Sequence, residues 1–369
     1  EYGNAMSGIV NAVTKDGGNE FHGSFNSGFS TYITENKRNG DEVFIGLDPF
    51  GINSNSDLKF SLSGPVIKDR LYFFTNFRTQ DVSGHLNGVR RFEVWNLSNF
   101  YDQDSSKWFS ENTGDSSFVP MNKGQYSSFM GKLSYNLGSI KLALMLNVNN
   151  SISRGYNHIY KYNPDGRSYG DGTTTLTMFQ LNHFLNEKMF YDVKYSITDN
   201  DYGSYVFEDY ASYKVLTEDG IHQGVYHFAG DTIYNYVNDK YMTAYGTGFF
   251  TGGQDKGHLN RITKTYNFKS DFTWQVTNAH SIKTGFSFIS HELENIYHTI
   301  RNAFAGTSLE SDQYKPIVLP DSTVYSDVYG VKPKERSFYI QDKFEKDEIV
   351  INVGLRYDEF DANTTYPSQ

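Results

Sequence analysis

The chain has 369 residues, no cysteine and a formal charge of −10, and it contains 29 phenylalanines, 29 tyrosines and 3 tryptophans. The lack of cysteine excludes a disulfide scaffold and a zinc–thiolate module, and no apolar run approaches the roughly 18 residues of a membrane-spanning helix. Net acidity without a Lys/Arg block argues against nucleic acid as a partner, because that binding needs clustered cations to neutralise phosphates.

Period-two alternation of apolar and polar residues recurs along the chain and predicts β-strands with one apolar and one polar face. The clearest example alternates Phe268 and Trp274 with residues such as Lys269. In the tenth predicted strand the facing is ambiguous, because Phe338 and Tyr339 compete for the apolar side. In chain order the pattern predicts eleven strands, at residues 20–32, 57–67, 71–80, 125–137, 140–150, 173–185, 189–199, 262–276, 281–290, 336–344 and 349–358.

The connections between these strands alternate between short and long. Tight turns are predicted at residues 68–70, 138–139, 186–188, 277–280 and 345–348. Long loops are predicted at residues 33–56, 81–124, 151–172, 200–261 and 291–335. In an antiparallel meander, alternate connections lie at opposite ends, so one end carries every turn and the other every long loop. Five such loops are uncommon in a compact soluble domain but usual on the extracellular side of transmembrane β-barrels.

These features predict an all-β fold, a transmembrane antiparallel β-barrel with apolar side chains facing lipid and polar ones facing the lumen. About ten residues of strand, tilted by roughly 40°, cross an apolar band about 25 Å tall. Rings beside the tight turns, such as Tyr72, Tyr135 and Trp274, predict an aromatic girdle. A soluble β-sandwich or propeller is the alternative, but it leaves the alternating loop lengths unexplained.

Three segments carry a family resemblance. Residues 7–24, SGIVNAVTKDGGNEFHGS, place a short strand and a Gly-Gly turn directly before the first long strand. This segment closely resembles the plug-to-barrel junction of TonB-dependent outer-membrane receptors, especially the Oar-like branch of Bacteroidetes-type bacteria. Residues 61–74, SLSGPVIKDRLYFF, are similar to the first periplasmic hairpin of that branch. YIQDK at 339–343, followed by VINVGLRYD at 350–358, is similar to its mid-barrel hairpin.

The resemblance implies a barrel of about 22 strands around a plug domain, in the outer membrane of a Gram-negative bacterium. It assigns residues 1–18 to the carboxy-terminal end of the plug and 19–369 to the first half of the barrel with long extracellular loops. The chain is therefore expected to be a fragment of a longer protein. The implied plug–barrel junction residues are Ser7, Gly8, Asn11, Thr14, Gly17, Gly18 and His22.

The implied function is that of a TonB-dependent receptor and transporter, which takes up a large solute by energy coupling. The implied partners are the TonB energy-transducing complex acting through the plug, outer-membrane lipids, an unidentified solute and the surface lipoprotein lid that some relatives use. The alternative is a non-enzymatic outer-membrane barrel that acts as an adhesin, a secretion-accessory component or a passive porin.

Two groups of residues are candidates for the site. Four charged residues are predicted to face the lumen: Lys269, Asp271, Arg356 and Asp358. They could line a solute path, hold the plug by charge pairing, or be only the polar side chains that any water-filled barrel interior needs. Residues 200–260 contain nine tyrosines and four phenylalanines, whose rings suit either stacking on a solute or packing within the loop. Eight carboxylates against three lysines in that loop disfavour a strongly anionic ligand. The predicted solute-contacting tyrosines are Tyr202, Tyr205, Tyr210, Tyr213, Tyr234 and Tyr236.

The sequence shows no pattern for catalysis or metal binding. It contains no HExxH, GxSxG or phosphate-loop motif. Oxygen-bearing residues at 163–166 and 170–172 lack the calcium-loop register, which favours ordinary turns there. No metal, no cofactor and no enzymatic activity are therefore expected.

Overall fold

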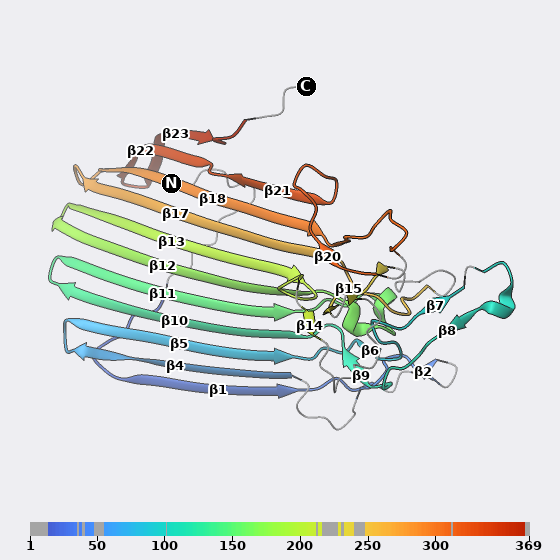
Figure 1. Ribbon diagram of the computed structural model, residues 1–369. Coiled ribbons are helices and arrows are strands. Elements are labelled where there is room, and N and C mark those ends of the chain that lie inside the picture. Colours follow the sequence, from blue (N-terminus) through green and yellow to red (C-terminus); the bar gives the residue numbers. More distant parts are fainter. Residues whose placement is uncertain are drawn as a thin grey trace.

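The computed structural model describes residues 14–34, 37–38, 41–47, 55–100, 102–211, 213–215, 228–229, 232–239, 248–310 and 313–365. Its main feature is one large antiparallel sheet in which the long strands lie side by side in chain order (Figure 1). All eleven predicted strands are confirmed: β1 (His22–Ser30), β4 (Asn55–Ile67), β5 (Leu71–Val82), β10 (Gly124–Leu137), β11 (Ile140–Ser153), β12 (Tyr169–Asn186), β13 (Met189–Tyr205), β17 (Gly257–Gln275), β18 (His280–Thr299), β22 (Lys334–Lys346) and β23 (Ile349–Asp361).

Several strands run further toward the long loops than the alternation predicts. β13 continues to Tyr205 rather than ending near residue 199, and β18 continues to Thr299 rather than ending near residue 290. The alternation also does not predict β21 (Ser326–Val331), which pairs with the far part of β18 in the same register as β22. Pro333, which has no backbone N–H to donate, separates β21 from β22. These extensions lack a regular apolar face, so no period-two signal marks them.

The two ends of the sheet differ as predicted, with tight turns on the left and loops on the right of Figure 1. Asp69, Gly138 and Asp347 in the turns adopt φ of 63°, 68° and 54°, a left-handed backbone that Gly and Asp accept. No helix in the described residues is long and apolar enough to cross a bilayer.

The loops hold β2 (Lys37–Arg38), β3 (Asp41–Glu42), β6 (Asn87–Val89), β7 (Ser98–Asn99), β8 (Phe109–Ser110), β9 (Phe118–Pro120), β14 (Tyr213–Val215), β15 (Phe228–Ala229), β16 (Thr232–Tyr234), β19 (Arg301–Asn302), β20 (Pro316–Ile317) and the 3₁₀ turns η1 (Ser105–Lys107), η2 (His158–Tyr160) and η3 (Pro164–Gly166).

One face of the sheet, here the apolar face, is lined with exposed rings. Phe25, Phe60, Phe77 and Phe129 are direct neighbours across β1, β4, β5 and β10. Each of these side chains is 41–69% exposed. A contiguous row of exposed phenylalanines is unfavourable in water but is the usual lining of a lipid-facing barrel surface.

The opposite face, here the polar face, carries charged and hydroxyl side chains. The ambiguous facing of β22 is settled by Tyr339, whose hydroxyl donates to Asp271 Oδ1 at 2.6 Å on the polar face. Phe338 is exposed on the apolar face. The predicted aromatic girdle needs one correction. Tyr135 and Trp274 lie on the apolar face, but Tyr72 lies on the polar face and donates to Asn19 Oδ1 at 3.0 Å.

Candidate functional site: the polar face, the amino-terminal strap and the loop cluster

The structure places the four predicted lumen residues on the polar face, in two pairs. Lys269 Nζ lies 3.1 Å from Asp271 Oδ2 on β17. Arg356 donates from Nε and Nη2 to Asp358 on β23, with Nη2 2.6 Å from Oδ1. Because Tyr339 also donates to Asp271, the first pair is tied to a strand two places along the sheet. Whether these groups line a solute path stays a prediction.

Residues 14–19, here the amino-terminal strap, are bound to the polar face through Asp16. Its carboxylate lies 2.7 Å from Lys132 Nζ and 2.5 Å from Lys141 Nζ, and it accepts a 2.8 Å hydrogen bond from Ser134. The Lys132 side chain is only 7% exposed. Burial raises the pKa of Asp16, but the hydrogen bonds from Lys132 and Lys141 outweigh it and lower that pKa to about 2. The strap therefore carries a carboxylate that stays ionised and bound at any physiological pH.

The rest of the strap fits closely over the first hairpin. A Cβ on Gly17 would lie 2.3 Å from the Phe73 carbonyl oxygen, so only glycine allows this approach. Asn19 donates to Asp69 Oδ1 at 2.6 Å and accepts from the Asp69 backbone N–H at 2.9 Å and from Tyr72. The strap is thus fixed both to β10 and β11 and to the turn between β4 and β5.

The predicted junction residues have different places in this arrangement. Thr14 accepts a 2.9 Å hydrogen bond from Lys132 through Oγ1. Gly18 leaves its Cβ position open, with nothing within 4 Å. His22 pairs with Ser63 at the start of β1. Ser7, Gly8 and Asn11 lie outside the described residues.

Sequence reasoning did not identify the groups that hold the strap, namely Asp16, Asn19, Lys132, Ser134 and Lys141. The available signal was weak. Asp16 stands in the family-like segment, and the two lysines and the serine occupy alternate positions on the polar side of predicted strands.

The loops have a small core of their own, here the loop cluster. Val206, Tyr236, Ile300 and Tyr314 are buried together, and Phe207, Tyr210 and Tyr234 pack against them. Phe207 and Tyr236 meet edge to face, with ring centroids 5.2 Å apart. This core joins described residues of the loop after β13 to described residues of the loop after β18.

The predicted solute-contacting tyrosines divide into two groups around this core. Tyr236 is 1% exposed and Tyr205 is 4% exposed, and Tyr205 stacks on His258 with centroids 5.2 Å apart. These two rings pack against other loop residues, which is the alternative that the sequence left open beside stacking on a solute. Tyr202 and Tyr205 also lie on β13 and not in the loop. Tyr202 is 38% exposed, Tyr210 and Tyr234 are partly buried and Tyr213 is on β14, and their solute contacts stay a prediction.

Lys256 is the one cation that the loop cluster encloses among the described residues. Its Nζ lies over the Tyr236 and Tyr314 rings, 5.6 and 5.8 Å from their centroids, and 3.4 Å from Asp239 Oδ1. Nζ makes no hydrogen bond of ordinary geometry within the described residues. Burial lowers the pKa of Lys256 to about 8, and the attraction of Asp239 only partly offsets this.

The pH dependence of the loop cluster should follow from Lys256. A lysine whose folded pKa lies below its unfolded value of 10.5 destabilises the folded state at pH values below 8, and the penalty is relieved as pH rises toward 10. Burial raises the pKa of Tyr236 to about 12, so this ring stays neutral across that window. We expect the loops to gain at most about 3 kcal/mol between pH 8 and 10, measured by hydrogen exchange of amides 206–208 and 300–302. Lys256→Met should remove the gain, and an equal gain in that variant would contradict the assignment.

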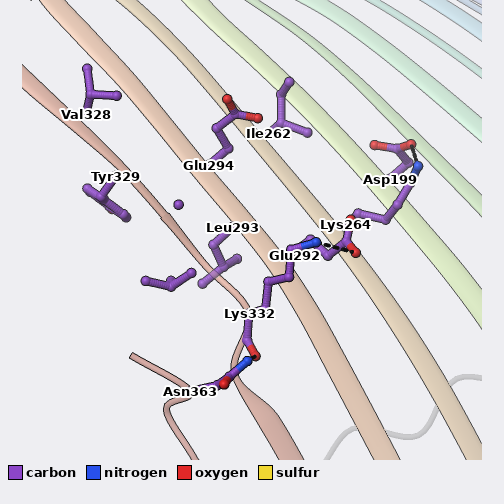
Figure 2. A pocket seen from close by; sticks show the side chains of 12 residues that line it. Asp199, Ile262, Lys264, Glu292, Leu293, Glu294, Val328, Tyr329, Lys332 and Asn363 are labelled. Carbon is purple, nitrogen blue, oxygen red and sulfur yellow. Dashed lines mark hydrogen bonds and ion pairs between the residues drawn. The ribbon is translucent and has the colours of Figure 1, made fainter. Parts of the chain in front are cut away.

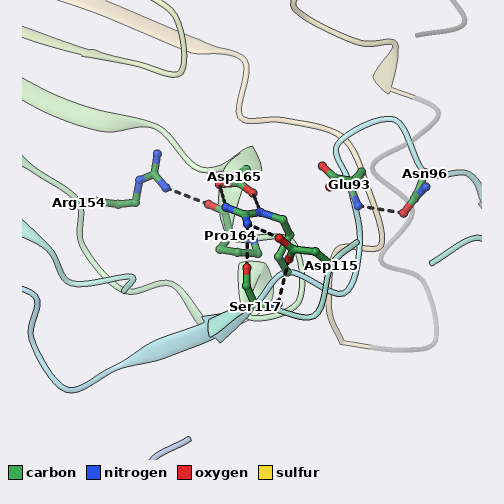
Figure 3. Close-up of polar contacts among 8 residues, drawn as sticks. Glu93, Asn96, Asp115, Ser117, Arg154, Pro164 and Asp165 are labelled. Atoms are coloured by element: carbon green, nitrogen blue, oxygen red, sulfur yellow. Dashed lines mark hydrogen bonds and ion pairs between the residues drawn. The ribbon is translucent and has the colours of Figure 1, made fainter. Parts of the chain in front are cut away.

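A second contact joins the loops after β5 and β11. Arg90 Nε donates to Asp165 Oδ2 at 2.5 Å, and Arg90 Nη1 donates to Asp115 at 3.0 Å and to Ser117 at 2.8 Å (Figure 3 shows the acceptors). The hydrogen bonds that Arg90 donates to the Asp165 carboxylate raise the pKa of Arg90. Asp165 belongs to one of the two oxygen-rich turns considered for calcium, and here its carboxylate binds a guanidinium.

Removing this contact should loosen the two loops. Arg90→Ala is expected to lower their local stability by about 1 to 3 kcal/mol, because charge-assisted hydrogen bonds to three side chains are lost. The neighbouring Arg91→Ala is the control, since Arg91 is exposed and lies 5.7 Å from the Phe92 ring centroid. Limited proteolysis between residues 90 and 120 measures the effect, and equal cleavage rates in the two variants would count against it.

On the apolar face, a band of charges stands between the exposed rings and the loops. Asp199, Lys264 and Glu292 are direct cross-strand partners on β13, β17 and β18. Lys264 lies 3.3 Å from Asp199, and Lys332 lies 3.2 Å from Glu292. Figure 2 shows these ion pairs along an open groove of about 770 Å³. Paired charges at this level suit the polar headgroup region of a bilayer.

No group of three or more His, Asp or Glu side chains within the described residues is arranged to hold a metal ion. At the strap, the polar side chains pair with one another, and at the loop cluster Lys256 pairs with Asp239. Their arrangement can bind and position a chain segment, as the contacts of Asp16 with Lys132, Ser134 and Lys141 do for the strap.

Comparison with known proteins decides the family. The family model described as outer membrane beta barrel domain matches residues 95–367. The chain belongs to this family. As an outer-membrane β-barrel domain it is located in the outer membrane of a Gram-negative bacterium, consistent with its row of exposed phenylalanines.

Its relatives are transporters and receptors. The TonB-dependent transporter Oar of Myxococcus xanthus is 34% identical over 79 residues, which is 21% of this chain and 7% of Oar. The outer membrane transporter YddB from Escherichia coli has a TM-score of 0.55 at 13% identity, with 93% of this chain and 39% of YddB covered. The ferripyoverdine receptor of the outer membrane of Pseudomonas aeruginosa has a TM-score of 0.52 at 12% identity, with 94% of this chain and 38% of the receptor covered. The 13% and 12% identities to YddB and to the ferripyoverdine receptor show a shared fold alone. The chain spans less than half the length of each of these three proteins.

Proposed function

We propose that this β-barrel domain belongs to a TonB-dependent receptor and transporter of the Oar-like, Bacteroidetes-type branch, which takes up a large solute by energy coupling. In this proposal residues 1–18 are the carboxy-terminal end of a plug, and residues 19–369 are the first half of the barrel with its long extracellular loops. The proposed partners are the TonB complex, acting on the plug, and outer-membrane lipids. A surface lipoprotein lid stays a prediction.

The observation that carries the proposal is the binding of the strap to the polar face. A porin needs no chain segment attached across its inner wall, whereas a plugged receptor must join its plug to its first barrel strand. The strap enters β1 directly after being held by Lys132, Lys141 and the first hairpin. The similarity to Oar and the barrel fold shared with YddB support the same reading.

Energy dependence tests the function. Cells that produce the full-length protein would be offered a pool of labelled oligosaccharides, peptides and ferric chelates, and uptake would be compared with cells that lack the gene. Accumulation that requires the gene should stop when TonB is deleted or when a protonophore collapses the proton gradient. Gene-dependent uptake that continues under both conditions would contradict energy coupling and favour a passive porin.

A further inference from the structure

The amino-terminal strap is held on the barrel wall by ion pairs and a hydrogen bond that all involve the Asp16 carboxylate, so a pulling force would act on all of them at once. Asp16 binds Lys132 on β10 and Lys141 on β11, while Ser134 donates to the same carboxylate. Charge-assisted hydrogen bonds are about twice as strong as neutral ones, and here three converge on one side chain. A pull on the chain before Thr14 would have to break them at the same time.

The backbone next to Asp16 also lies close against the first hairpin. Gly17 approaches the Phe73 carbonyl so closely that an added Cβ would lie 2.3 Å from that oxygen and 3.0 Å from the Gly64 carbonyl oxygen. Beyond it, Asn19 is bonded to Asp69. Lys132 is almost fully buried, so separating it from Asp16 would leave a buried ammonium without its carboxylate, which is strongly unfavourable.

We propose that Asp16 is the positioning residue at which a pull on the plug is stopped, so that residues 14–19 stay on the barrel wall while the chain before them is moved. This inference rests on the proposed function, because it assigns the fixed end of the segment on which the energy machinery acts. It divides the junction at Thr14: the chain before Thr14 takes up the movement, and residues 14–19 stay held on the barrel wall.

The test applies force directly and needs neither TonB nor a solute. Full-length protein in a lipid nanodisc would carry dyes at Gly18→Cys and Ser139→Cys, and magnetic tweezers would pull on its amino-terminal end. The chain has no native cysteine, the Cβ position of Gly18 is open and Ser139 lies in an exposed turn. Energy transfer between the dyes reports whether the strap has left the wall.

At a fixed force, Asp16→Asn should shorten the time to separation by about tenfold or more, the change expected from losing a charge-assisted hydrogen bond. Asp16→Glu should recover part of that time, and Lys141→Met should have a smaller effect because Lys132 remains. The melting temperature of the barrel should stay unchanged in all three, which separates a stop for the pull from a general structural role.

Equal separation times for Asp16→Asn and the unaltered protein would overturn the proposal. If Asp16→Asn does not fold, Lys141→Met and Ser134→Ala decide the question, because each removes one partner and leaves Asp16 bound to Lys132. Unchanged times in both would also overturn it. A TonB-independent uptake result would remove the proposed function without altering this measurement, so the two failures are distinguishable.

Discussion

Leu144→Arg should destabilise the folded protein in a bilayer by about 2 to 4 kcal/mol, the cost of a cation on the lipid face near the membrane midplane. Leu144 lies on the apolar face of β11, is 51% exposed and has Leu133 and Phe179 as its cross-strand partners. It is five residues beyond Ser139, which ends the tight turn, and at a strand tilt of about 40° this places it near the middle of a band about 25 Å tall. Denaturant unfolding of the full-length protein in lipid vesicles measures the change.

Asn147→Arg is the matched control for this prediction. Asn147 lies three residues along the same strand on the polar face, between Met130 and Leu176. An arginine there would meet the wet interior, so its effect should stay within about 1 kcal/mol. Equal losses for the two variants would show that the apolar face does not meet lipid.

The second large effect is expected at the strap, where Gly17→Ala should release residues 14–19 from the polar face. The added methyl group would lie 2.3 Å from the Phe73 carbonyl oxygen, and backbone atoms on two strands leave it no space. We expect a local cost of about 1 to 3 kcal/mol, as for overpacking a tight contact. Hydrogen exchange of amides 16–19 in the full-length protein should become at least several-fold faster.

The adjacent Gly18→Ala separates this steric effect from the general effect of removing a glycine. A Cβ on Gly18 would meet nothing within 4 Å, so alanine should be neutral or stabilise the strap by up to about 1 kcal/mol. If Gly17→Ala exchanges no faster than Gly18→Ala, the close approach of Gly17 to the first hairpin is not what holds the strap.

The sequence predicts the sheet well because membrane strands must alternate. Ten of the eleven long strands have an apolar residue at every second position over part of their length, while β1 has phenylalanines four residues apart, and tight turns such as the one at Gly138 mark one end. The other end is harder to predict. Beyond residues such as Asp199 and Glu292 the outward positions become polar, so β13 and β18 continue without a periodic signal.

The candidate site could be predicted only in part, because it depends on contacts between distant segments. Lys269 and Asp271 could be assigned to the polar face from alternation alone. The partners of Asp16 could not, since Ser134 and Lys141 are 118 and 125 residues away in the chain. Likewise, composition does not distinguish the buried Tyr236 from the exposed Tyr202, because burial depends on how two loops fold together.

The phenylalanine row and the charged band on the apolar face belong to one line of cross-strand partners. From Phe129 the line runs through Val148 and Thr175 to Asp199 and Lys264. Because barrel strands tilt by about 35–45°, residues that are cross-strand partners along this line lie at different depths in the bilayer. Whether a position on the apolar face tolerates a charged side chain should therefore depend on its depth in the bilayer and not on its place in the line of cross-strand partners.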